Sequence, residues 1–219
     1  MKPPLTILLL LLPLAVFGQE TNLDNKTAAA SIMHEDHGRL AIGNALERTD
    51  IIIASVTHTP DGKSRAEMRL GEIVKGATVE FSFDLAIDES FSQRTGIVMQ
   101  TIGPPFNQPS FALRVKDGRF HLSHGPDEKT LPLTDARPGV WQNWRFVIRN
   151  FGPDASFEVF LDGKSILTGS GNTDNGQKKS ILRLGPYIGR DRKGDATAYL
   201  DQIRVASGII SPLNPGSKP

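Results

Sequence analysis

The stretch "TVEFSFDLAI" at residues 78–87 alternates apolar and polar side chains along its length. Phe81 and Phe83 would share one face of a strand, and Ser82 and Asp84 the other, because successive strand side chains point to opposite faces. A strand with one apolar and one polar face is typical of an antiparallel sheet that covers a core on one side and meets water on the other. This stretch therefore predicts a strand of a β-sheet protein.

The neighbouring sequence predicts more strands joined by tight turns. In "FALRVKDGRFHLSH" and "FEVFLDGKSILT" an Asp-Gly pair separates two runs, which is the strongest short-range signal for a hairpin. Many short strands of this kind favour an all-β fold, a jelly roll of two stacked antiparallel sheets. In "RLAIGNALER" at residues 39–48 we expect two turns of helix instead. We expect the space between the sheets to hold Phe81, Phe83, Trp144, Phe146, Phe157 and Val159.

The sequence divides into four parts. Residues 1–18 contain one lysine and then an apolar run ending in small residues, which indicates a secretory signal peptide cleaved after Gly18; left uncleaved, the run would be an anchor. Residues 19–45 form a polar N-terminal segment expected to be partly disordered, residues 46–207 the jelly-roll domain, and residues 208–219 a proline-rich tail. We therefore expect a secreted or periplasmic protein without a membrane span once the signal is removed.

Composition excludes several partners and kinds of chemistry. The 25 basic and 24 acidic residues give a net charge of +1, which gives no reason to expect nucleic acid or an anionic membrane as a partner. The chain has no cysteine, so it has no disulfide and no thiol nucleophile. His34 and His37 lack the spacing of a zinc-binding helix, and no strand carries the carboxylate pair of a jelly-roll glycosidase. We expect a monomer without a cofactor. The sequence does not decide whether a structural Ca²⁺ ion is bound.

Charged and hydrogen-bonding side chains are spread over several of the predicted strands. Arg65, Glu67 and Arg69 stand two residues apart, so they would form a row on one face of a sheet. The other candidates are Gln100, Arg114, His121, Arg183 and Tyr187. Arginine binds a carboxylate through two parallel hydrogen bonds, so cations combined with an amide and a phenol suit an anionic sugar. Taken singly, each such residue is more often just solvated on a strand surface.

Three segments resemble jelly-roll polysaccharide lyases, and they follow the same order along the chain. "RAEMR" is similar to the R-[ST]-E-[LM]-R stretch of the alginate lyases and of their heparin- and glucuronan-lyase relatives. "VMQTI" resembles their Q-[IV]-H strand, and "LRLGPYIGR" resembles their F-K-x-G-x-Y segment, with Arg183 for the Lys and Tyr187 for the Tyr. The resemblance covers about residues 58–206, and "WQNWRF" with the later "DGK" hairpin is most similar to the heparin- and glucuronan-lyase branch. It implies a concanavalin A-like sandwich.

The resemblance also implies an activity, the cleavage of an acidic, uronate-containing polysaccharide by β-elimination. Arg65 and Gln100 would neutralise the sugar carboxylate, and they would act like an oxyanion hole when the proton at C5 leaves. Tyr187 would donate a proton to the leaving glycosidic oxygen. The residues expected to hold the polymer are Glu67, Arg69, Arg114 and Arg183.

One position departs from the family pattern. Ile102 stands where the family strand has its histidine, which in relatives neutralises the carboxylate or abstracts the proton. His121 on the hairpin, or His58, would have to replace it, or Tyr187 would serve as both base and acid. The alternative is a carbohydrate-binding jelly-roll module that no longer cleaves. The sequence leaves both interpretations open and does not decide which uronate polymer is bound.

Overall fold

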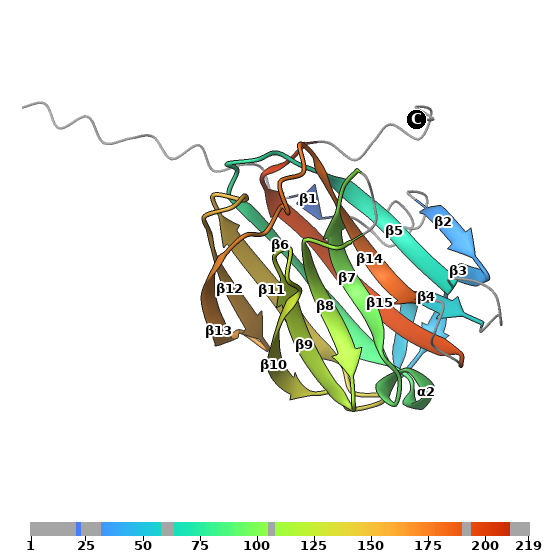
Figure 1. The fold of residues 1–219 in the computed structure, drawn as a ribbon. Coiled ribbons are helices and arrows are strands. Elements are labelled where there is room, and N and C mark those ends of the chain that lie inside the picture. Colours follow the sequence, from blue (N-terminus) through green and yellow to red (C-terminus); the bar gives the residue numbers. More distant parts are fainter. Residues whose placement is uncertain (1–20, 23–31, 58–63, 105–107, 190–193, 211–219) are drawn as a thin grey trace, which may run out of the picture.

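The fold is a sandwich of two antiparallel sheets of eight strands each (Figure 1). The computed structural model describes residues 21–22, 32–57, 64–104, 108–189 and 194–210. Within these residues the only helix is the short α2 (Glu89–Ser92), which Asp88 caps by accepting a hydrogen bond from the Phe91 backbone N–H. The predicted all-β class and jelly-roll architecture are therefore confirmed.

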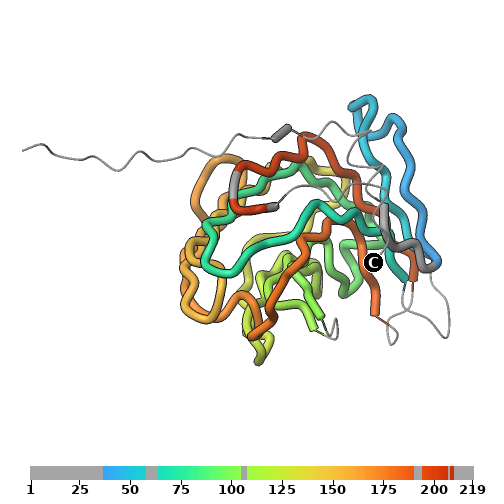
Figure 2. Tube along the Cα trace, turned by 90° about the horizontal axis from the view of Figure 1, so that it is seen from above, coloured from blue at the N-terminus to red at the C-terminus, as the bar shows by residue number. Residues whose placement is uncertain are grey.

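Sheet A has the strand order β13-β12-β11-β6-β15-β4-β3, and β1 pairs with β15 beside this path. Its strands are β1 (Thr21–Asn22), β3 (Gly38–Ala45), β4 (Arg48–Val56), β6 (Val79–Ile87), β11 (Gln142–Arg149), β12 (Ala155–Leu161), β13 (Lys164–Gly171) and β15 (Ala196–Ser207). The order brings together segments far apart in the sequence, and Figure 2 shows β4 in blue beside β15 in red.

Sheet B has the strand order β10-β9-β8-β7-β14-β5-β16, and β2 pairs with β5 beside this path. Its strands are β2 (Ile32–Asp36), β5 (Ser64–Ile73), β7 (Gly96–Ile102), β8 (Phe111–Lys116), β9 (Arg119–His124), β10 (Lys129–Asp135), β14 (Ser180–Ile188) and β16 (Ile209–Ile210). Strands β5, β14 and β7 are direct neighbours in this order, and they carry most of the residues singled out in the sequence.

The apolar side chains of both sheets meet in one core. Every side chain predicted to lie between the sheets is at most 2% exposed: Phe81, Phe83, Trp144, Phe146, Phe157 and Val159. The rings of Phe81 and Phe146, on adjacent strands, stack with centroids 5.0 Å apart. Phe111 of sheet B meets Phe157 of sheet A edge to face at 5.4 Å. Burying each ring contributes on the order of 2 kcal/mol to folding, and the edge-to-face contact joins the two sheets.

Both predicted Asp-Gly hairpin turns are present. Asp117 and Gly118 have φ angles of 51° and 71°, and they join β8 to β9. Asp162 and Gly163 have φ angles of 50° and 77°, and they join β12 to β13. Two consecutive residues with positive φ are the mark of the tight turn whose twist matches the paired strands.

The helix expected at residues 39–48 is wrong, because this segment forms the hairpin of β3 and β4. Leu46 and Glu47 make the turn with φ angles of 51° and 64°, the conformation that Asp-Gly usually provides. Nothing in the local sequence signals it, and pairing with the sheet decides the outcome over local propensity. The boundary expected at residue 46 falls inside this hairpin, so the sandwich also includes β3.

Candidate functional site

The row of charges on β5 lies on the outer face of sheet B, away from the core. Arg65 and Arg69 are half-buried, whereas Glu67 between them is only 1% exposed. The residues that alternate with this row belong to the core, and they are Ala66, Met68 and Leu70. The alternation read from the sequence is thus present, with one face of β5 apolar and the other charged.

Neighbouring strands bring three of the other candidates beside this row or near it. Arg183 on β14 is the register partner of Arg69 on one side and of Gln100 on the other. Tyr187, further along β14, is the register partner of Arg65. Three adjacent strands therefore present cations, an amide and a phenol on one face of sheet B.

Glu67 is the centre of a buried polar cluster. The Gln100 Nε2 atom donates a hydrogen bond to Glu67 Oε1, and Arg183 Nη1 lies 3.6 Å from Glu67 Oε2. Gln100 and Arg183 are only 2% and 6% exposed. Burial raises the pKa of the Glu67 carboxyl above its ordinary value, and Arg183, Gln100 and Arg65 oppose that rise. A carboxylate in this place fixes the side chains of its two partners.

Three arginine side chains gather around Glu67. Burial lowers the pKa of Arg183, Glu67 raises it, and the like charges of Arg65 and Arg69 lower it further. Arginine nevertheless stays protonated in proteins. Arg65, Arg69 and Arg183 thus bring three guanidinium groups to this face, where Glu67 and Glu72 are described carboxylates that act on them. Guanidinium groups suit an anionic ligand.

Arg65 and Tyr187 contact each other directly. The guanidinium carbon of Arg65 lies 5.0 Å from the centre of the Tyr187 ring, a cation–π contact. Tyr187 is half-buried, so its ring is packed while part of the side chain meets solvent. This contact places a phenol and a guanidinium within reach of a single sugar residue.

Gly185 gives β14 the shape that this cluster needs. Its φ angle is 130°, a conformation that residues with a side chain rarely adopt. A Cβ atom at this position would lie 2.1 Å from the carbonyl oxygen of Ala66 on β5. The pairing of β14 with β7 also shifts register between Leu184 and Tyr187. The glycine therefore permits the close approach of β14 to β5 between Arg183 and Tyr187.

Arg114 and His121 lie apart from this cluster, on β8 and β9. The Nε atom of Arg114 donates a hydrogen bond to Ser123 Oγ at 2.7 Å. Its Nη2 atom forms an ion pair with Glu128 Oε1 at a distance of 3.2 Å. His121 is the register partner of Arg114, so three strand spacings, about 14 Å, separate the backbone of His121 from β14. Arg114 and His121 face the same side as the cluster, but the structure does not bring His121 to Tyr187.

The position of the family histidine is apolar in this fold. Ile102 is 7% exposed and is the register partner of Ile181, which is exposed to the same extent. It lies two residues beyond Gln100 and faces the same side of β7. His58, the other replacement considered, lies outside the described residues, as does the expected signal peptide.

Two further expectations concern metal ions and membranes. Among residues 21–22, 32–57, 64–104, 108–189 and 194–210, no group of three or more histidine and acidic side chains is placed to hold a metal ion. In the same residues no helix has the length and apolar character needed to cross a bilayer.

Comparison with known proteins finds likeness in structure only. No family model and no curated protein sequence matches this chain. The alginate lyase AlgAT5, of polysaccharide lyase family 7, superimposes with a TM-score of 0.59 at 13% identity, over 79% of this chain and 84% of its own. The alginate lyase from Corynebacterium sp. gives a TM-score of 0.58 at 13% identity, over 76% of this chain and 80% of its own.

A different enzyme contains the same sandwich. A sialidase superimposes with a TM-score of 0.60 at 11% identity over 87% of this chain, but over only 19% of its own length. The chain therefore has the jelly-roll fold of the alginate lyases, and this fold also occurs as a part of a larger protein. Likeness at these identities defines the fold, whereas the chemistry must be argued from the site.

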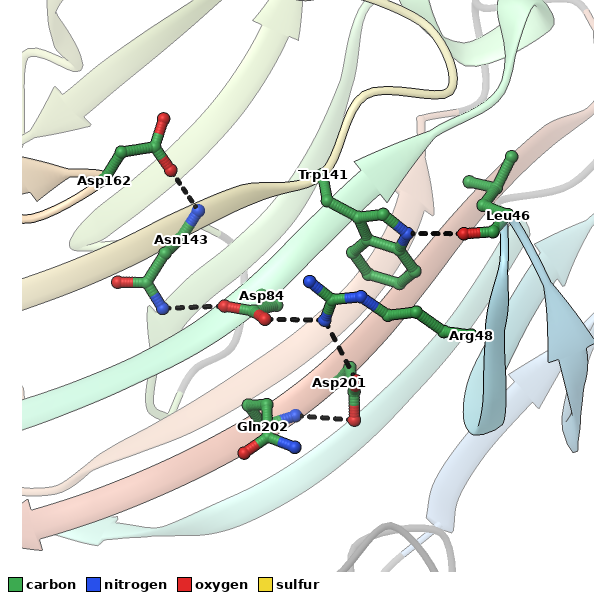
Figure 3. Close-up of polar contacts among 8 residues, drawn as sticks. All are labelled: Leu46, Arg48, Asp84, Trp141, Asn143, Asp162, Asp201 and Gln202. Atoms are coloured by element: carbon green, nitrogen blue, oxygen red, sulfur yellow. Dashed lines mark hydrogen bonds and ion pairs between the residues drawn. The ribbon is translucent and has the colours of Figure 1, made fainter.

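The structure also shows a polar network that the sequence analysis missed, on sheet A. Arg48 Nη1 lies 2.6 Å from Asp84 Oδ2 and 2.9 Å from Asp201 Oδ2 (Figure 3). Asp84 and Asp201 are register partners on β6 and β15. The alternation of β6 placed Asp84 on a polar face, but only the strand order of the sheet reveals that Asp201 lies beside it.

Proposed function

We propose that this protein is an exported lyase that cleaves an acidic, uronate-containing polysaccharide by β-elimination. The observation that carries the proposal is the cluster on sheet B, in which Arg65, Gln100 and Tyr187 come from three adjacent strands around Glu67. The fold supports it, because the alginate lyase AlyC3 has been solved in complex with dimannuronate at a TM-score of 0.55, 10% identity.

The cluster provides the groups that stabilise charge on the substrate. The Nε2 atom of Gln100 carries two hydrogens, and only one is used in the bond to Glu67. The second can be donated to a substrate carboxylate, and Arg65, which acts on the same Glu67 carboxylate, supplies a guanidinium. When the C5 proton leaves, negative charge spreads onto the carboxylate oxygens. Donors that Glu67 already holds in place stabilise this charge without reorganising.

The proton transfers are assigned to Tyr187. An ionised Tyr187 takes the proton from C5, the electron pair forms the C4–C5 double bond, and the bond from C4 to the glycosidic oxygen breaks. The same hydroxyl then protonates the leaving oxygen, so the side chain returns to its starting state. This assignment needs the C5 proton and the leaving group on the same side of the sugar ring. It is favoured because His121 lies three strand spacings from β14.

Ile102 favours a second candidate function, that of a binding module without catalysis. An isoleucine can neither neutralise a carboxylate nor carry a proton. Arginine side chains would still be present to bind an acidic polymer, because Arg65, Arg69 and Arg183 do not depend on this position. The two functions differ in one outcome, namely whether bound polymer is cleaved.

The deciding experiment incubates the purified protein with alginate, glucuronan and heparin-like polymers. Cleavage by β-elimination is followed by the ultraviolet absorbance of the unsaturated uronate product, and binding is followed separately by calorimetry. Product from at least one polymer is the expected result. Binding without product on every polymer would establish the binding module, and the absence of both would overturn the two candidates together.

A pair of matched variants tests the role of Tyr187. The Tyr187→Phe variant keeps the ring and its contact with Arg65 but loses the hydroxyl, so turnover should fall by about 10²–10⁴-fold with binding nearly unchanged. The chain has one other tyrosine, Tyr199 on β15 of sheet A, and Tyr199→Phe should leave turnover intact. Equal rates in the two variants would contradict the assignment.

A further inference from the structure

The outer face of sheet A carries a hollow of about 410 Å³, on the opposite side of the sandwich from the cluster around Glu67. Its floor is Ser82 on β6, whose small side chain lies between Arg145 on β11 and Arg204 on β15, its two register partners. The volume lies within the ~300–1,000 Å³ typical of pockets for small ligands. We refer to it as the sheet A hollow.

At one end of the hollow lie Asp84 and Asn143, which belong to a connected set of polar side chains (Figure 3). Asn143 Nδ2 donates to Asp84 Oδ1 at 2.7 Å, and Arg48 holds the other oxygen of Asp84. Arg48 in turn lies over the ring of Trp141, 4.1 Å from its centre, and Trp141 Nε1 donates to the Leu46 carbonyl at 3.1 Å. The ring and the guanidinium thus hold Asp84 in one orientation.

The other end is held in the same way. Arg145 Nε donates to Glu80 Oε1 at 2.8 Å, and the Arg145 guanidinium lies 4.7 Å from the centre of the Phe160 ring. Gln202, which also lines the hollow, is exposed and lies instead at the Asp84 end, where its backbone N–H donates to Asp201 Oδ1 at 2.8 Å (Figure 3). Because the carboxylates of Glu80 and Asp84 and the guanidinium of Arg145 are held in these contacts, a ligand would lose little affinity to ordering them.

Charged side chains of both signs line the hollow. Glu80 and Asp84 oppose Arg145 and Arg204, so the lining is neutral overall, and the pair Arg48 and Asp201 behind it adds no net charge. A polyanion would meet carboxylates here as well as cations. A sugar hydroxyl, in contrast, can donate to a carboxylate and accept from a guanidinium or an amide.

We propose that the sheet A hollow binds an uncharged carbohydrate, through hydroxyl groups that donate to Glu80 and Asp84 and accept from Asn143, Arg145 and Arg204. The site is distinct from the cluster around Glu67 on sheet B and does not depend on cleavage there. The protein would then recognise two chemically different sugars on its two outer faces.

The experiment titrates the full protein with uncharged oligomers of glucose, of mannose and of galactose, and with alginate oligomers as the acidic probe. Binding is measured by calorimetry and by saturation-transfer NMR. We expect at least one uncharged oligomer to bind, and its affinity to fall about tenfold or more in Arg204→Ala, which loses a charged hydrogen-bond donor. Ser82→Trp, which fills the floor, should abolish this binding.

Two controls keep the result specific. Arg149 lies on β11 as Arg145 does, two alternate positions further along the same face, and it does not line the hollow. Arg149→Ala should therefore bind the uncharged oligomer as wild type does. Gln100→Ala on sheet B should also retain this binding.

Three outcomes would overturn the proposal. These are no binding of any uncharged oligomer, equal loss in Arg149→Ala and Arg204→Ala, or alginate binding that Arg204→Ala removes and Gln100→Ala leaves intact. The last would assign an acidic sugar to the hollow. Circular dichroism of Ser82→Trp checks folding, and Arg204→Ala, at an exposed position, tests the proposal if Ser82→Trp is misfolded.

Discussion

Glu67 shows how one residue organises a site made mostly of its neighbours. A carboxylate that is 1% exposed is costly unless it is paired, and here Arg183 and Gln100 partner it. The direction of the pKa shift shows that burial outweighs these partners. The residue therefore holds donors in place for a ligand at some cost in stability, as functional sites often do.

The first prediction concerns the Glu67→Gln variant. The folded-state pKa of Glu67 is raised above its ordinary 4.5, so its contribution to stability is fully present below about pH 4.5 and is lost as pH rises through the folded-state pKa. Glutamine cannot ionise and avoids this loss. The free energy of unfolding of the variant, minus that of wild type, should rise with pH above about 4.5, measured by urea unfolding.

A control for Glu67→Gln lies on the same strand. Glu72 of β5 has an exposed partner, Lys179, at 3.1 Å, and is not enclosed as Glu67 is. Glu72→Gln should show a difference from wild type that varies less with pH. A difference for Glu67→Gln that stays constant from acid to neutral pH would contradict the direction of the pKa shift.

The second prediction restores the family histidine with Ile102→His. An imidazole here faces the same side as Gln100 and adds a group that can neutralise a carboxylate or accept a proton, so turnover of a uronate polymer should rise. Burying a polar ring in place of isoleucine should lower stability by about 1–3 kcal/mol. The product absorbance and the urea midpoint measure the two effects.

Ile181 provides the matched comparison for this variant. It is the register partner of Ile102 and equally buried. Ile181→His therefore buries an imidazole on the neighbouring strand at a similar cost in stability. It should lower stability without the gain in turnover. Equal turnover in Ile102→His and wild type would show that the missing histidine does not limit the reaction.

At the scale of elements, the sequence predicted what depends on local pattern. The alternation of Phe81 with Ser82 gave β6 and its buried face, and Asp-Gly at Asp117 and Asp162 gave two hairpins. The hairpin at Leu46 was missed, since these residue types give no turn signal and the sheet imposes the positive φ angles.

The site depends on information that a single strand does not contain. The contact of Glu67 with Gln100 and Arg183 requires β14 to lie between β5 and β7, an order set by long-range pairing. Resemblance to a family supplied that grouping, whereas local pattern alone did not. The network of Arg48 with Asp84 and Asp201 had no family segment to indicate it, so the structure was needed.

The third prediction concerns the shape of β14. Gly185→Ala forces a side chain into a φ angle of 130° and against the Ala66 carbonyl, so it should destabilise the protein by about 2 kcal/mol or more. It should also weaken uronate binding, because Arg183 and Tyr187 would separate from β5. Thermal unfolding and calorimetry measure the two losses.

The same substitution at Gly189 tests whether the effect is specific. Gly189 follows β14 by one residue, and a Cβ atom there would have no neighbour within 4 Å. Gly189→Ala should therefore be close to neutral in stability and in binding. Comparable losses in the two variants would show that the close approach at Gly185 does not shape the site.

The fourth prediction belongs to the whole molecule, because it concerns acid stability. His124 is buried in sheet B against the Phe157 ring of sheet A, with ring centres 4.9 Å apart, and burial lowers its pKa below the ordinary 6.5. In the unfolded chain His124 binds a proton near pH 6.5, whereas in the folded protein it binds that proton only at lower pH. The stability of the fold should therefore fall as pH drops below about 6.5. Thermal midpoints across this range measure the fall.

Two histidine variants isolate that fall. His124→Gln cannot gain the proton, so its thermal midpoint should drop less than that of wild type between neutral and acid pH. His121→Gln, on the outer face of the same strand, should follow wild type. A parallel decline in all three proteins would assign the acid sensitivity to other groups.

The two sheets cover one core, so their outer faces point in opposite directions (Figure 1). Two ligand sites so arranged cannot easily engage one stretch of polymer together, so the protein gains little avidity for a single chain. It would instead act as a cross-linker that draws an acidic and an uncharged polysaccharide into one network.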